Sequence, residues 1–283
     1  MVFHSVWWKH FLCLRAAAAG TILFPMTANC LTIAGSDSGG GAGIQMDLAV
    51  FRALETHGLS AITCLTAQNP ETVRAVHPVP TEFLVSQLST LVEYFPLGAV
   101  KTGMLFNEEI ISEVSAFLQN HPRLPVVIDP VMVATSGAVL LQEEAIYALR
   151  EKLLPRATLV TPNLDEVAVL TGSKPTDLET MRQAGRDLFR QYQSPFLIKG
   201  GHLEGDQLVD VLILNETEYR EFPSSRISGL NTHGSGCLLA AAIAASLARG
   251  HELEEAVTKG LAFFQKAANH PQSLGPDSFL NPR

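Results

Sequence analysis

Cysteine is scarce in the 283-residue sequence, and no two cysteines stand in a CxxC pair. The absence of paired spacing excludes the common zinc-binding motifs. The four cysteines are scattered through a long chain, which does not predict a disulfide framework either. We therefore expect a protein of the reducing cytoplasm.

Positive charge is also in short supply. Lysine and arginine number 20 against 28 aspartates and glutamates, the formal net charge is -8, and no stretch is rich in basic residues. An acidic surface without a basic stripe argues against nucleic acid as the main partner. Lys9, His10 and Arg15 interrupt the apolar runs at the start of the chain, so no membrane-spanning helix is expected there.

Internal repeats and low-complexity linkers are absent after Met26. The chain is 47% hydrophobic and 17% charged, which is the balance of a compact α/β enzyme. We expect residues 1–29 to be an N-terminal extension outside the fold, residues 30–270 to form a single domain, and residues 271–283 to be a tail of coil. A targeting role for the extension is the alternative.

Short apolar runs alternate with amphipathic stretches along the chain. Strands are expected at 30–34, 60–66, 99–102, 126–129, 159–161 and 196–199. Helices are expected between them at 43–57, 81–95, 108–120, 142–154, 163–171 and 177–192. A hairpin-like edge pair at 208–214 and 219–222 follows, and then helices at 234–249 and 253–268. Strands that alternate with helices predict an α/β fold with a largely parallel sheet.

Polar and glycine residues follow the predicted strands, at the edge where parallel sheets bind ligands. The first such segment, GSDSGGGAGIQMD at residues 35–47, turns the chain sharply before a helix. It lacks the GK[ST] ending of a phosphate loop, and Ile44 stands where a dinucleotide fingerprint needs glycine. A plain tight turn is the alternative to a ligand loop. Asp47 falls near the helix start, where it favours the helix dipole or hydrogen-bonds a ligand amine.

A second small-residue loop, NTHGSGC at residues 231–237, leads into an alanine-rich helix. Backbone N–H groups at such a helix start suit a phosphoryl group that carries negative charge in the transition state. Cys237 is expected in the first turn, where the helix dipole lowers a thiol pKa. A helix cap with a buried structural cysteine is the other interpretation.

Two carboxylates at neighbouring strand ends, Asp129 and Glu166, suit a partly hydrated Mg²⁺ that bridges phosphates. Asn163 as a helix cap with Glu166 in the first turn needs no metal, and both interpretations stay open. Lys199, at another strand end beside two glycines, is placed to neutralise nucleotide phosphates. Together these groups predict phosphoryl transfer.

These motifs resemble those of the bacterial hydroxymethylpyrimidine/phosphomethylpyrimidine kinase family of thiamine biosynthesis. The resemblance runs in order from about residue 31 to about residue 270, and the first thirty residues have no counterpart in the family. It is carried by the segments 35–47, 68–69, 101–105, 129–132, 161–164 with Glu166, 199–203 and 231–237.

The resemblance implies a ribokinase-like fold, three layers α/β/α with a central, mostly parallel sheet, and a kinase that uses ATP and Mg²⁺. Such an enzyme phosphorylates the pyrimidine alcohol to a monophosphate and then the monophosphate to a diphosphate. Gln68 and Asp47 would hydrogen-bond the aminopyrimidine. Gly35, Met104 and Val131 would line its pocket.

The resemblance also implies an anion hole formed by Gly234, Ser235, Gly236 and the amide of Cys237. The Cys237 thiol would take the proton of the hydroxyl group or orient the alcohol.

Asp129, Asn163 and Glu166 would then organise Mg²⁺, mostly through water, and Lys199 would contact the ATP phosphates. The family resemblance also suggests a homodimer.

Three other functions compete with this one. A pyridoxal or pyridoxine kinase has the same fold, and pocket selectivity between small rings can be modest, although Gln68 and Met104 favour the pyrimidine. A non-catalytic protein that senses the pyrimidine could lose Cys237, Asp129 or Glu166, but all three are present. A dinucleotide-dependent oxidoreductase is disfavoured by the glycine spacing.

Overall fold

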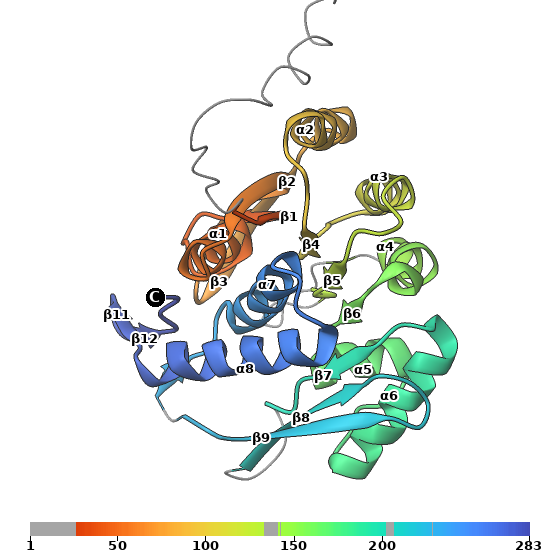
Figure 1. Ribbon diagram of the computed structural model, residues 1–283. Helices are drawn as coiled ribbons and strands as arrows, with labels where there is room; N and C mark the ends of the chain where they lie inside the picture. The colour runs from red at the N-terminus through yellow and green to blue at the C-terminus, as the bar shows by residue number, and fades with distance from the viewer. Residues whose placement is uncertain (1–26, 133–140, 142, 202–206, 228) are drawn as a thin grey trace, which may run out of the picture.

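The computed structural model describes residues 27–132, 141, 143–201, 207–227 and 229–283. Residues 1–26 of the expected extension lie outside the described residues, as do residue 142 of an expected helix and residues 202 and 203 of the expected phosphate segment. The described chain forms one large sheet with helices on both faces and a small second sheet (Figure 1).

The large sheet has nine strands in the order β3-β2-β1-β4-β5-β6-β7-β8-β9. Strands β2, β1, β4, β5, β6 and β7 pair in parallel, whereas β3, β8 and β9 are antiparallel to their neighbours. The central strands are short apolar runs because helices cover both of their faces. The bounds are β1 Asn29–Asp37, β2 His57–Asn69, β3 Thr72–Pro78, β4 Ala99–Thr102, β5 Val126–Ile128, β6 Leu159–Val160, β7 Phe196–Ile198, β8 Gln207–Ile213 and β9 Tyr219–Ser225.

Helices α2 to α6 pack on one face of the sheet, and α1, α7 and α8 pack on the other (Figure 1). Side chains alternate along each strand, so Leu31 and Ile33 of β1 join the first core layer and Cys30 joins the second. This confirms the expected three-layer arrangement. The bounds are α1 Gly43–Ala53, α2 Thr81–Tyr94, α3 Glu108–Gln119, α4 Glu143–Ala148, α5 Leu164–Thr171, α6 Leu178–Tyr192, α7 Ser235–Ala248 and α8 Leu253–Asn269.

Helix α7 is the alanine-rich helix that the sequence predicted, and its residues from Leu238 to Leu247 are buried. The small side chains of α7 and Gly260 of α8 let these two helices approach closely. A Cβ on Gly260 would lie 2.5 Å from Ile243 Cγ1 of α7. Its apolar character therefore serves the core. In the part of the chain that the structure describes, no helix combines the length and hydropathy needed to cross a membrane.

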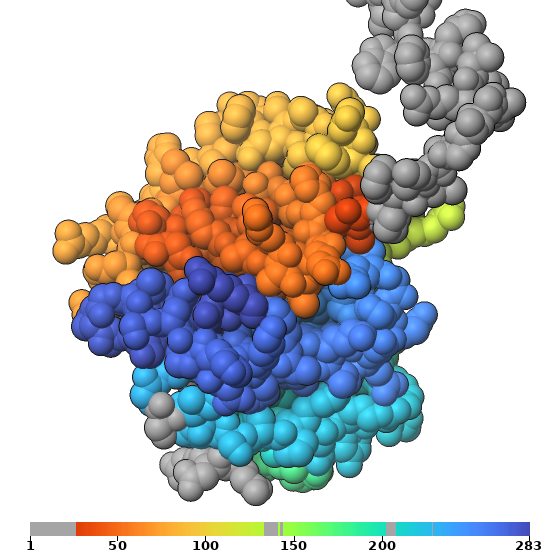
Figure 2. Space-filling model, turned by 60° about the vertical axis from the view of Figure 1, so that its left-hand side comes forward, coloured from red at the N-terminus to blue at the C-terminus, as the bar shows by residue number. Residues whose placement is uncertain are grey.

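Several elements differ from the sequence-based expectation; the helix expected at 142–154, for example, is α-helical only over Glu143–Ala148. Strand β3 was not expected. The prediction of coil for residues 271–283 was wrong, because β11 (Gln272–Leu274) and β12 (Asp277–Phe279) form a hairpin that turns at Gly275. Strand β12 also pairs with β10 (Leu230–Asn231), and Figure 2 shows this C-terminal segment in dark blue beside the orange residues near the chain start. Strands β10, β11 and β12 are two or three residues long and, unlike the equally short β5, β6 and β7, contain no apolar run, so the sequence pattern could not reveal them.

A buried ion pair ties α1 to the sheet. Lys101 of β4 and Asp47 of α1 lie 2.9 Å apart, and both side chains are 0% exposed. Thr32 Oγ1 of β1 donates a second hydrogen bond to the same carboxylate oxygen at 2.6 Å. Burial opposes the charged form of Lys101, but the charge of Asp47 outweighs it and raises the pKa of the lysine. The charged pair is therefore part of the core.

Removing one partner of this ion pair is expected to destabilise the fold. Lys101→Met should lower the free energy of unfolding by about 3–5 kcal/mol, because it leaves the Asp47 carboxylate buried without a counter-charge. Lys101→Met combined with Asp47→Leu should lose less than the lysine change alone. Urea denaturation followed by circular dichroism measures both variants.

Lys259→Met is the control, since it removes an exposed ion pair with Glu255 and should change the stability little. A Lys101→Met protein as stable as the wild type would contradict the expectation.

Candidate active site

The carboxyl ends of the parallel strands open into a cavity of about 920 Å³. It is lined by the last residues of β1 and β2, by residues after β4, β5, β6 and β7, and by the start of α7, as expected for a sheet of this kind. The cavity brings together every site residue predicted from the sequence except Asp47. These are Gly35, Gln68, Met104, Asp129, Val131, Asn163, Glu166, Lys199, Gly234, Ser235, Gly236 and Cys237.

The start of α7 is an anion cradle built from glycines. Gly234, the N-cap, has φ 80°, and a Cβ there would lie 1.9 Å from the carbonyl oxygen of Gly41. Only glycine satisfies both constraints. The first turn of a helix leaves N–H groups without helical acceptors, here those of Gly236 and Cys237. These groups and the helix dipole favour a negatively charged ligand.

A cation lies beside this cradle. Lys199 follows β7, and its Nζ donates to Asp129 Oδ1 at 3.1 Å. A Cβ on Gly236 would lie 3.2 Å from both Lys199 Nζ and Asp129 Oδ2, which places the pair against the first turn of α7. Burial would lower the pKa of Lys199, but the charges of Asp129 and Glu166 raise it. The lysine therefore stays an ammonium ion at the cradle.

The segment after β6 forms the helix cap that one of the two interpretations predicted. Asn163 and Glu166 form a capping box, since Asn163 Oδ1 accepts the Glu166 N–H at 2.9 Å and Glu166 Oε2 accepts the Asn163 N–H at 2.8 Å. Burial raises the pKa of Glu166 to about 7, Lys199 opposes this rise, and the neighbouring charge of Asp129 adds to it. The capping role does not exclude a metal role, because two interacting carboxylates line the cavity.

These carboxylates fit a Mg²⁺ ion that keeps most of its water. Within the described ranges, no group of three or more His, Cys, Asp and Glu side chains could hold a metal by itself. Mg²⁺ in phosphoryl-transfer sites is bound by one or two carboxylates together with substrate phosphates. Asp129 and Glu166 beside the cradle match that donor set.

The expected lowering of the Cys237 pKa is contradicted. Burial raises the pKa of this thiol to about 11; Lys101 lowers it, whereas Asp47 and Asp129 raise it further. Desolvation and two carboxylates thus outweigh the helix dipole and the hydrogen bond from the Gly43 backbone. At neutral pH the side chain is a neutral thiol.

Asp47 is not a pocket residue in this structure. Its carboxylate is fully buried under the cavity and binds Lys101 and Thr32. Sequence position alone suggested a ligand contact, because Asp47 lies one helical turn beyond Gly43. The helix directs its side chain toward the sheet, so Asp47 acts on the site through its charge and through Lys101 without lining the cavity.

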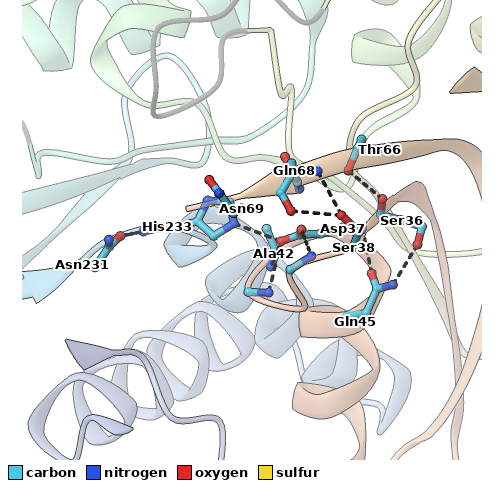
Figure 3. A network of polar contacts seen from close by, with 12 residues as sticks. Ser36, Asp37, Ser38, Ala42, Gln45, Thr66, Gln68, Asn69, Asn231 and His233 are labelled. Atoms are coloured by element: carbon cyan, nitrogen blue, oxygen red, sulfur yellow. Dashed lines mark hydrogen bonds and ion pairs between the residues drawn. The ribbon is translucent and has the colours of Figure 1, made fainter. Parts of the chain in front are cut away.

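The other predicted pocket residues do come together. A Cβ on Gly35 would lie 2.8 Å from Cys64 Sγ and 3.7 Å from Met104 Sδ, so the absence of a side chain keeps space free beside Met104. Gln68 lies on β2 itself, which runs longer than expected, and its backbone is clamped by two hydrogen bonds with Ser38 (Figure 3). An open space with an amide at its edge suits a small polar ring.

The structure adds cavity residues that the sequence did not single out as functional. Asp37 and His233 contact each other at 3.0 Å on the wall of the cavity (Figure 3). Asp210 of β8 accepts the N–H of Gly200 at 2.7 Å, and burial raises its pKa to about 6. A lone carboxylate inside an apolar strand was the available signal for Asp210. No local pattern could pair Asp37 with His233.

Known proteins share these features. The family model described as Phosphomethylpyrimidine kinase matches residues 37–280. The hydroxymethylpyrimidine/phosphomethylpyrimidine kinase of Haemophilus influenzae is 42% identical over 87% of the chain and 92% of that protein. The thiamine biosynthesis bifunctional protein ThiED of Geobacter sulfurreducens is 46% identical over 87% of the chain, and the chain spans only 50% of that longer relative.

The solved ADP complex of Bacillus subtilis pyridoxal kinase is 34% identical, with a TM-score of 0.82 over 90% of the chain and 97% of that kinase. This likeness, together with the sheet order and the helix layers, confirms the ribokinase-like fold that the motifs predicted. The family model covers most of the sequence and agrees with the relatives, and on that evidence the chain belongs to the phosphomethylpyrimidine kinase family.

Proposed function

We propose that this kinase transfers the terminal phosphoryl group of ATP to 4-amino-5-hydroxymethyl-2-methylpyrimidine, and then a second one to the resulting monophosphate, in thiamine biosynthesis. The observation that carries the proposal is one cavity that joins an anion cradle, a cation and a pocket for a small ring. The Haemophilus relative, a hydroxymethylpyrimidine/phosphomethylpyrimidine kinase, supports this substrate, and the Geobacter relative supports a place in thiamine biosynthesis. A homodimer and a cytoplasmic location belong to the proposal.

In the proposed mechanism, side chains of the cavity position the pyrimidine. The amide of Gln68 hydrogen-bonds the aminopyrimidine, and the ring occupies the space that Gly35 leaves open beside Met104 and Val131. The neutral thiol of Cys237 suits a role in orienting the alcohol, because it would have to lose its own proton before it could accept another.

The N-terminus of α7 then binds the phosphoryl group while it is transferred to the pyrimidine. The N–H groups of Gly236 and Cys237 would donate to the oxygens on which charge develops, and Lys199 beside them would neutralise part of that charge. Phosphoryl transfer passes through a loose transition state, so positioning and charge stabilisation supply most of the rate. A strong general base is therefore not required.

Asp129 and Glu166 would hold Mg²⁺, with Asn163 keeping Glu166 in place through the capping box. Bound there, Mg²⁺ would supply positive charge against the phosphate oxygens. Two carboxylates would suffice for an ion that keeps most of its water.

A pyridoxal kinase is the second candidate, because the Bacillus pyridoxal kinase superimposes on most of the chain. Both substrates are small planar rings with a hydroxymethyl group, so the fold does not separate them. Ring selection depends on the residues around Gln68 and Met104.

Purified protein with Mg-ATP is expected to convert the hydroxymethylpyrimidine to its diphosphate, because the cradle and ring pocket serve both steps. Chromatography of the products resolves monophosphate from diphosphate, and pyridoxal assayed in parallel tests the second candidate. Turnover of pyridoxal alone would replace the substrate assignment. Binding of the pyrimidine without any phosphorylated product would support the sensor function instead.

Cys237→Ala is expected to lower kcat by roughly fivefold, the equivalent of losing one hydrogen bond of about 1 kcal/mol. The KM for the pyrimidine should change little, because the ring contacts remain. Steady-state kinetics on the folded variant measures both quantities. A loss of about 10²- to 10⁴-fold would make the thiol a proton acceptor, and normal turnover would remove it from both roles.

Lys199→Met is expected to lower kcat/KM for ATP by roughly 10²-fold, since the cradle loses its cation and Asp129 loses its partner. Affinity for the pyrimidine alone should be retained, which calorimetry can measure. Lys152→Met is the control, because it removes an exposed pair with Glu108. Equal ATP kinetics in both variants would contradict the role of Lys199.

A further inference from the structure

We propose that Asp37 and His233 form a positioning pair that holds the anion cradle of α7 in register with the pyrimidine pocket. The inference rests on the proposed function and deepens it. The pair acts on two loops, the turn after β1 and the loop before α7, and neither residue needs to touch the reacting atoms itself. Figure 3 shows Asp37 and His233 pointing toward each other, one from each loop.

Asp37 organises the turn after β1. Its Oδ1 accepts the N–H of Gly39 at 2.7 Å, and its Oδ2 accepts the N–H groups of Gly41 and Ala42 at 3.1 and 2.8 Å. The carboxylate is almost fully buried, yet these bonds and those from His233 and Gln68 hold its pKa below the usual value against the effect of burial. Asp37 is therefore an anion that can only accept hydrogen bonds.

His233 brings the other loop to this anion. Its Nε2 lies 3.0 Å from Asp37 Oδ2, and it directly precedes Gly234, the N-cap of α7. An ionised carboxylate accepts, so Nε2 carries the hydrogen. The contact joins residues that are 196 positions apart in the sequence.

The small sheet of β10, β12 and β11 holds the backbone of His233 in place through Asn231. Asn231 Oδ1 accepts the His233 N–H at 3.0 Å, and Asn231 Nδ2 donates to Asp277 Oδ2 at 3.1 Å. Asn231 lies on β10, which pairs with β12. The cradle is thus held between Asp37 on one side and the C-terminal hairpin on the other.

The two loops also touch through their backbones, which makes their spacing critical. A Cβ on Gly41 would lie 2.8 Å from His233 Cδ2, and one on Gly234 would lie 1.9 Å from the Gly41 oxygen. Asp37 further reaches Gln68, the expected pyrimidine contact, through a hydrogen bond. One carboxylate therefore connects the ring pocket to the cradle. A displacement of about 1 Å between reacting groups costs roughly 10²-fold in rate.

The test compares His233→Ala with His233→Gln in the full-length chain. His233→Ala is expected to lower kcat by roughly 10- to 100-fold. The dissociation constants of the pyrimidine alone and of a non-hydrolysable ATP analogue alone should stay near the wild-type values. His233→Gln should recover most of kcat, because its amide nitrogen can donate to Asp37 in the same place.

His251→Ala is the matched control, since His251 pairs with Glu255 at the start of α8 and does not line the cavity. Its kcat should equal that of the wild type. A His233→Ala enzyme with normal kcat, or equal losses in the alanine and glutamine variants, would overturn the positioning pair.

Hydrogen exchange separates this inference from the proposed function. Amides of residues 231–237 should exchange faster in His233→Ala than in His233→Gln, whichever substrate the kinase uses. Unchanged exchange in His233→Ala would overturn the pair even if the pyrimidine is the substrate. Absence of pyrimidine turnover by the wild type, together with faster exchange in His233→Ala, would reject the function and keep the pair.

Discussion

The contact of Gly234 with the carbonyl of Gly41 leaves no room for a side chain, and the rest of the site is arranged around it. It brings the start of α7 against the turn after β1, so that a phosphate cradle and a ring pocket share one cavity. Glycine is needed twice over, because the same residue has φ 80°. The packing of α7 between the sheet and α8 makes this approach rigid.

Two ion pairs balance the charges in and below the cavity. Lys101 and Asp47 neutralise each other below the cavity, and Lys199 and Asp129 do so at its wall. Burial raises the pKa of Glu166 to about 7, and the charge of Asp129 adds to this rise. Burying these charged side chains costs free energy. Bound phosphates and a hydrated cation would add compensating charges beside them. The Cys237 thiol remains neutral within it.

Kinases for two different vitamin rings share this scaffold, as the likeness to a pyridoxal kinase and the sequence relatives in thiamine biosynthesis show. The groups that handle phosphate come from the helix start and the strand ends, and they do not depend on the ring. We propose that ring choice rests on a few cavity residues such as Gln68 and Met104. The fold therefore sets the chemistry, and a small part of the cavity sets the substrate.

The sequence by itself determined the α/β class, the order of the main strands and helices, and most of the site, because glycine and polar residues after apolar runs mark strand ends. It could not orient Asp47, since a helix position does not state which neighbour its side chain meets. Strands β11 and β12 and the contact of Asp37 with His233 were also beyond it. Local patterns report neighbours in sequence. Pairings across the whole chain, and the desolvation that raises the pKa of Cys237, exist only once the chain is folded.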